Sequence, residues 1–132
     1  KLSWVDLQGN ELGSAGVRAV VSALASTPAL AALDLSATSV DDAGAKAIGR
    51  VLPSVPRLSA LRLDSNQIGD PGAESLAQAL RSVPELRALS LSGNDIGSAG
   101  VESLLMALRH SPHLAALGLS APERGRAAPL EK

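Results

Sequence analysis

The sequence contains no cysteine, phenylalanine or tyrosine, and its 132 residues include one tryptophan and one methionine. The absence of cysteine excludes disulfide bonds and cysteine-ligated metal sites, and it fits a reducing compartment. A core without Phe or Tyr has to be built from aliphatic side chains. Leu and Ala supply most of the apolar residues, so we expect many small and similar contacts, as in a repetitive structure.

The sequence also has no large excess of positive or negative charge, because it contains 12 Lys and Arg and 13 Asp and Glu, which gives a net charge of −1. Without clustered basic side chains, neither nucleic acid nor a membrane surface is an expected partner. The apolar runs are too short to cross a bilayer, and no basic-then-apolar signal opens the chain. We expect an intracellular, cytoplasmic protein, and because the first residue is Lys1 we interpret the sequence as part of a longer chain.

What the sequence does have is a strict repeat of 28 residues. Leucine, proline and glycine columns keep this interval along the chain: Leu2, Leu30, Leu58, Leu86, Leu114; Pro28, Pro56, Pro84, Pro112; Gly16, Gly44, Gly72, Gly100. We place full repeats at 2–29, 30–57, 58–85 and 86–113, a partial repeat at 114–122 and a tail at 123–132. Pro122 and Arg124 break the pattern at the end of the partial repeat.

Each unit has the pattern of a short strand followed by a helix. The segment L-x-x-L-x-L ends in the alternation of a strand, and the second half has helical spacing. The residues of one column should cap the helix N-termini: Ser14, Asp42, Asp70 and Ser98. We interpret Asp41, which directly precedes Asp42, as the neighbour of such a cap. The glycine column should let the helix approach the strand closely, and the helices should end before the proline column.

A single strand-and-helix unit cannot bury its apolar face, so neighbouring units must stack to exclude water. We therefore predict an α/β fold in which the units form a right-handed β-α superhelix. The strands should form a curved parallel sheet on the inside of this solenoid, and the helices should lie outside it.

The pattern L-x-x-L-x-L-x-x-N-x-(I/L)-G, at Leu58–Gly69 and Leu86–Gly97, resembles the leucine-rich repeat. Its length and helix resemble the ribonuclease-inhibitor-like subclass, which includes the sensor arrays of NOD-like receptors and the Ran GTPase-activating protein. The resemblance covers most of the chain. It implies a hydrogen-bonded asparagine ladder along the inner loops, at Asn10, Asn66 and Asn94, which Thr38 should weaken locally.

Helices cover only the outer face of such a sheet, so the inner face is the expected binding surface. Its aromatic and charged side chains belong to repeats one to three, and we hypothesise that they bind a protein partner: Trp4, Asp6, Asp34, Arg62 and Asp64. The alternative is that Trp4 packs against a preceding repeat, and that Asp34 and Arg62 form an ordinary surface ion pair.

Other chemistry has little support in the sequence. His110 and His113 are spaced like two metal ligands, but no third ligand stands near them. The glycine-rich stretch 93–100 recurs as part of the repeat and lacks the Lys-Ser/Thr of a phosphate loop. No local motif arranges Ser, His and Asp as a catalytic triad. We expect no metal, no cofactor and no catalysis.

The sequence thus favours a protein–protein interaction module or scaffold segment within a longer array, which binds a protein through the concave sheet. Two alternatives stay open: a regulator of an enzyme or receptor, such as a GTPase activator or a NOD-like-receptor sensor, and a structural subunit of a larger complex. The Ran type carries a strongly acidic tail, whereas 123–132 has charges of both signs.

Overall fold

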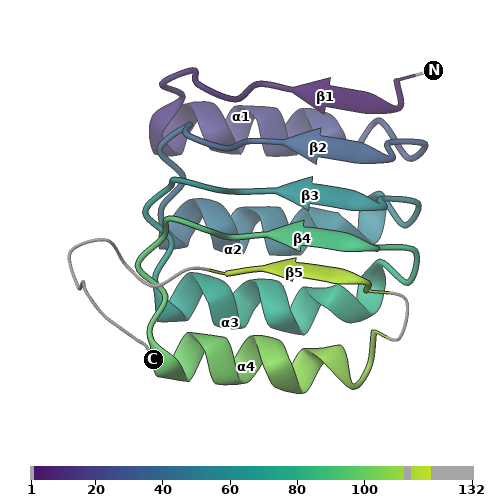
Figure 1. Ribbon diagram of the computed structural model, residues 1–132. Helices are drawn as coiled ribbons and strands as arrows, with labels where there is room; N and C mark the ends of the chain where they lie inside the picture. The colour runs from purple at the N-terminus through teal and green to yellow at the C-terminus, as the bar shows by residue number, and fades with distance from the viewer. Residues whose placement is uncertain (1, 112–113, 120–132) are drawn as a thin grey trace.

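Five short parallel strands form one sheet whose strand order follows the sequence. A computed structural model describes residues 2–111 and 114–119. The strands are β1 (Trp4–Asp6), β2 (Ala32–Asp34), β3 (Ala60–Arg62), β4 (Ala88–Ser90) and β5 (Ala116–Gly118) (Figure 1). Each strand residue pairs with the residue one repeat later, as Leu33 does with Leu61. The predicted α/β solenoid is confirmed, while the end of the partial repeat and the tail, 120–132, lie outside the described residues.

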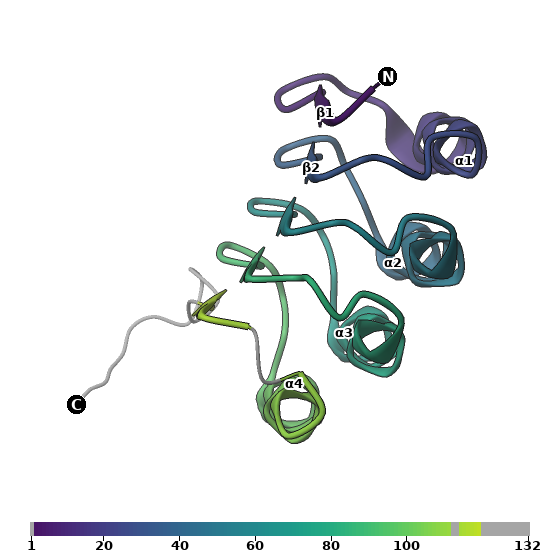
Figure 2. The same ribbon diagram turned by 90° about the vertical axis from the view of Figure 1, so that its right-hand side faces the viewer.

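A helix follows each of the first four strands: α1 (Gly13–Leu24), α2 (Asp42–Val51), α3 (Asp70–Ala79) and α4 (Ser98–Leu108). Two of them continue as short 3-10 turns, η1 (Leu52–Ser54) and η2 (Leu80–Ser82), which end before the proline column. Seen along the strands, the described helices all lie on one side of the sheet (Figure 2). The opposite, concave face of the sheet carries no helix among these elements.

The core lies between the sheet and the helices. The central residue of each interior strand points into it, and these leucines are at most 2% exposed: Leu33, Leu61 and Leu89. Their equivalents in the two edge strands, Val5 and Leu117, are only partly buried. Each repeat therefore hides its apolar face against the repeats on both sides, as the stacking argument requires.

The helix N-termini are capped in a way that the sequence pattern does not reveal. The Asp42 carboxylate does not cap its own helix. It accepts the N–H groups of Gly69 (2.8 Å) and Gly72 (2.9 Å), at the start of α3 in the next repeat. Asp70 accepts the equivalent two N–H groups of α4, at 2.7 and 3.0 Å. The prediction that this column caps its own helices is wrong, because the first turn of each helix lies beside the start of the next.

Helix α2 follows a different arrangement, because the preceding repeat has Ser14 in place of an aspartate. Its own Asp41 accepts the N–H of Gly44 at 2.9 Å, and the Ser14 hydroxyl donates to the same carboxylate at 3.0 Å. These donors, Gly44 first and then Ser14, hold the pKa of Asp41 below its ordinary value. A carboxylate thus caps each of α2, α3 and α4, supplied either by the helix's own repeat or by the one before.

The glycine column makes room for these carboxylates. A Cβ atom added at Gly72 would lie 2.7 Å from Asp42 Oδ1 and 3.0 Å from Ala45 Cβ. At Gly100 the equivalent Cβ would lie 2.6 Å from Asp70 Oδ1. The close approach is therefore to the preceding helix and to the isoleucine four residues earlier, Ile68 at 2.8 Å and Ile96 at 2.6 Å. The sequence pattern had indicated an approach to the strand instead.

Replacing Asp42 with alanine should lower the free energy of unfolding by about 1–2 kcal/mol, because two N–H groups at the start of α3 lose their acceptor. The midpoint and slope of urea denaturation measure this change. Ser98→Ala is the matched control, since Ser98 occupies the same column and is exposed. Equal effects of the two substitutions would contradict capping from the preceding repeat.

Candidate functional site

The inner loops are joined by asparagine side chains that reach from one repeat into the one before. Asn66 is buried, and its carbonyl oxygen accepts the N–H groups of Thr38 (3.0 Å) and Val40 (2.9 Å). Its amide group donates to the carbonyl of Leu35 at 3.0 Å and to two carbonyls of its own repeat. Asn94 makes the same kind of bridge, accepting from Ile68 and donating to Leu63.

The loop between repeats one and two lacks such a bridge. The Thr38 hydroxyl donates within its own repeat, to Leu35 O, and Asn10 donates to Leu7 O, also within its own repeat. Helix α1 begins at Gly13, one residue earlier in the repeat than the other three helices. Thr38 is too short to hold the preceding loop in the shape that Asn66 and Asn94 impose on later loops.

The candidate binding residues lie on or next to the sheet face that carries no described helix. Trp4 and Asp6 alternate with Val5 on β1, so they point away from the core, and Trp4 is 64% exposed. Strand register places Asp6 beside Asp34. The other strands carry alanine in the Trp4 column: Ala32, Ala60, Ala88 and Ala116. Trp4 is therefore the one large apolar side chain of that column.

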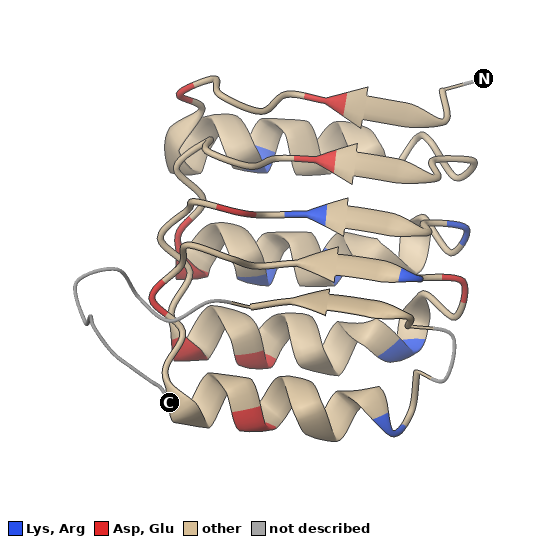
Figure 3. Cartoon of the chain, viewed as in Figure 1, with Lys and Arg blue, Asp and Glu red and all other residues tan. Residues whose placement is uncertain are grey.

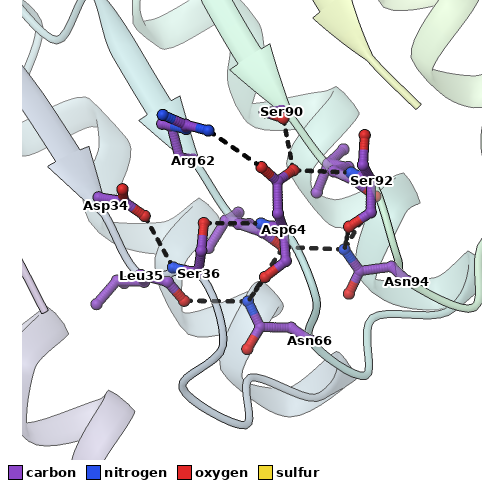
Figure 4. Close-up of polar contacts among 11 residues, drawn as sticks. Asp34, Leu35, Ser36, Arg62, Asp64, Asn66, Ser90, Ser92 and Asn94 are labelled. Carbon is purple, nitrogen blue, oxygen red and sulfur yellow. Dashed lines mark hydrogen bonds and ion pairs between the residues drawn. The ribbon is translucent and has the colours of Figure 1, made fainter. Parts of the chain in front are cut away.

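The charged residues are not paired as the sequence suggested. Within the described part of the chain, Arg62 forms an ion pair with Asp64, two residues later. The distance from Arg62 Nη2 to Asp64 Oδ2 is 3.5 Å. Asp34 is 8% exposed and accepts the N–H of Ser36 at 3.0 Å. The alternative of an Asp34–Arg62 surface pair is wrong: Asp34 is turned into its own loop, and Arg62 pairs with its near neighbour on the chain (Figure 4).

Asp64 ties the third repeat to the fourth. Its carboxylate accepts the hydroxyl of Ser90 and the N–H of Ser92, the latter at 2.9 Å, in addition to facing Arg62 (Figure 4). Its side chain is 20% exposed, whereas that of Arg62 is 60% exposed. Among the five candidates, Trp4, Asp6 and Arg62 are thus exposed to solvent, whereas Asp34 and Asp64 are more buried. Asp6 accepts the N–H of Gln8 at 3.1 Å, as Asp34 accepts that of Ser36, so these two residues differ in burial and share this hydrogen bond.

Metal and membrane sites find no counterpart in the described structure. Among residues 2–111 and 114–119, no three His, Cys, Asp or Glu side chains lie close enough together to hold a metal ion. His110 is exposed, and His113, the second histidine of the candidate pair, lies outside the described residues. No helix in the described part of the chain combines the length and apolar character needed to span a bilayer.

Comparisons with known proteins agree with this architecture. A sequence profile described as "Leucine Rich repeat" matches residues 2–21, 58–77 and 84–105. A comparison with curated protein sequences finds no match. Actin-binding site 2 of leiomodin-1 is similar in structure, with a TM-score of 0.80 and 22% identity over 89% of this chain and 70% of that one. The C-terminal domain of Caenorhabditis elegans tropomodulin gives a TM-score of 0.73 and 19% identity, over 91% and 74%.

At these identities, the structural likeness establishes the fold. Leucine-rich-repeat domains typically bind proteins, and they do so through extended curved surfaces. The profile matches, the 28-residue register and the alternation of strand and helix lead to one conclusion. The chain folds as a leucine-rich-repeat solenoid, and its 28-residue repeats are of the ribonuclease-inhibitor-like kind.

Proposed function

We propose that this chain is a protein-interaction module, without catalytic activity, that binds its partner through the concave face of the sheet. The observation that carries the proposal is Trp4, whose large aromatic side chain is 64% exposed on the face that carries no described helix. Exposed aromatic and arginine side chains dominate the binding energy of many protein interfaces. Trp4 and Arg62 are the two side chains of this type presented on the described strands.

The remaining inner-face residues have supporting roles in the proposal. The alanine column beside Trp4 leaves the sheet shallow, so a partner can approach the strands closely. Asp6 and Arg62 offer opposite charges on the exposed column of β1 and β3, which favours a partner with complementary charges. Asp34 and Asp64 act indirectly, because their carboxylates fix the loops that follow β2 and β3.

Actin is the first partner to test. The similar leiomodin-1 structure is an actin-binding site of that protein. Because this chain shares the fold, we propose actin binding as the first role to test. An intracellular, cytoplasmic location is part of the same proposal, and the absence of cysteine supports it.

The experiment is cross-linked capture of partners on the immobilised chain, combined with co-sedimentation with actin filaments. Trp4→Ala should reduce the retained partner on the order of tenfold or more, and Arg62→Ala should reduce it as well. Lys46→Ala is the matched control, because Lys46 is exposed on α2, on the helical side of the sheet. If Trp4→Ala and Arg62→Ala both retain as much partner as the unchanged chain does, binding through the concave face is refuted.

A further inference from the structure

The helical side of the molecule carries two open grooves that occupy the same place in different repeats. One lies between α1 and α2, and the other, of about 490 Å³, lies between α3 and α4. Every residue lining the first has its equivalent two repeats later in the sequence, in or beside the second. The repeat thus supplies an internal control, because differences between the grooves do not come from the fold.

The largest difference is Met106. Its column faces solvent on the helices, and the other three repeats fill it with polar side chains, Ser22, Arg50 and Gln78. Met106 is 57% exposed. The neighbouring Leu105 is also exposed, but it belongs to a core column and is uncovered because no described helix follows α4. That explanation does not apply to Met106, whose flexible apolar side chain is common at binding surfaces.

Two arginines and a histidine line one end of the same groove. Arg81, Arg109 and His110 line the C-terminal ends of α3 and α4, where the first groove has Ala25 and Ser54. The first groove has its arginines, Arg18 and Arg50, at the positions of Glu74 and Met106, so the two grooves differ in where their charges lie. In Figure 3, basic segments (blue) lie at one end of α3 and α4, and acidic segments (red) lie toward the other end. Neither the Arg81 nor the Arg109 side chain makes an ion pair or hydrogen bond within the described residues.

Basic side chains at a helix C-terminus are favourable for the helix alone, so the arginines by themselves indicate no partner. Their position beside an exposed methionine does. The partly buried Ala107 lines the groove next to Met106, whereas Ala77 is buried. Met106 and Ala107 thus form an apolar surface that leads to two arginines without a partner among the described residues. A ligand that fits both features has an apolar side chain followed by carboxylates.

We propose that the α3–α4 groove docks a partner protein through a short acidic segment. An apolar side chain of that segment lies over Met106 and Ala107, and its Asp or Glu residues pair with Arg81 and Arg109. This surface is on the opposite side of the sheet from Trp4, so it adds a second contact site to the module and does not depend on the concave face.

The test is a selection from a random twelve-residue peptide library displayed on phage, followed by fluorescence anisotropy of the selected peptides. The key variant combines Arg81→Ala, Met106→Arg and His110→Ser, which brings the groove closer to its α1–α2 equivalent. This variant keeps the formal net charge, because one arginine is lost and one is gained. Met106→Gln, which copies α3, is a milder second variant, and thermal unfolding checks that both remain folded.

The proposal predicts selected peptides with an apolar residue next to two or more Asp or Glu. Their affinity should fall at least tenfold in the triple variant, decrease with added salt, and stay unchanged in Trp4→Ala. The proposal is overturned if no peptide is enriched, if the enriched peptides lack the acidic-apolar pattern, or if they bind the triple variant and Met106→Gln as tightly as the unchanged chain.

Discussion

Replacing Asn66 with alanine should lower the free energy of unfolding by about 2–5 kcal/mol, although the substitution removes only a small polar side chain. All three carbonyls to which the Asn66 amide donates keep another donor: Leu35 O accepts the Thr38 hydroxyl, Leu63 O accepts the Asn94 amide, and Asp64 O accepts the N–H of Ala37. The N–H groups of Thr38 and Val40 have no such replacement among the bonds described. Both residues are buried, so each donor loses its acceptor without gaining water.

The same column contains a control for this prediction. Asn10 is exposed and its side chain donates to Leu7 O within its own repeat. Asn10→Ala should therefore change the free energy of unfolding by less than about 1 kcal/mol. Urea denaturation followed by circular dichroism compares the two variants. If Asn66→Ala and Asn10→Ala cost the same, the bridge between repeats two and three does not stabilise the fold.

The second large effect is expected for Leu61→Ala, which should cost about 2–5 kcal/mol. Leu61 is fully buried at the centre of β3, and its register partners are Leu33 and Leu89 on either side. The cavity cannot collapse easily, since the sheet spacing and the helices behind it are fixed by the neighbouring repeats. The loss thus combines the lost burial of the side chain with the cost of the cavity.

Leu105→Ala is the matched control, because Leu105 is 52% exposed on α4. We expect it to cost less than about 1 kcal/mol, as only part of its surface is removed from water. Denaturation curves for both variants in the same buffer make the comparison. A denaturation midpoint that Leu61→Ala leaves unchanged would mean that this strand is not part of a packed interior.

The repeat made much of the fold predictable from the sequence. A period of 28 residues with a strand-like and a helix-like half fixes the register, since each strand residue must meet its equivalent in the next unit. The capping pattern was not predictable in the same way. Asp42 and Asp70 stand where a helix start is expected, but only the packing of α2 against α3 shows that the carboxylate reaches the next helix.

The candidate site was predicted in position but not in detail. Strand alternation correctly placed Trp4 and Asp6 on the exposed side of β1. It could not show that Asp34 bonds its own loop, because side-chain hydrogen bonds after a strand depend on the local turn. The sequence contains one signal of the α3–α4 groove: Met106 is the single apolar residue in an otherwise polar column. This signal becomes informative only when the structure shows that α3 and α4 form a groove lined by Met106.

Cysteine cross-linking tests the stacking of the repeats most directly, because the chain has no cysteine of its own. The double variant Ala60→Cys, Ala88→Cys joins register partners on β3 and β4, and adjacent strands lie about 4.8 Å apart, within the reach of a disulfide. In Ala32→Cys, Ala88→Cys the two sites are separated by β3 and should be too distant. We predict an intramolecular disulfide in the first variant and none in the second; cross-linking of the second, or failure of the first, would contradict the stacked parallel sheet.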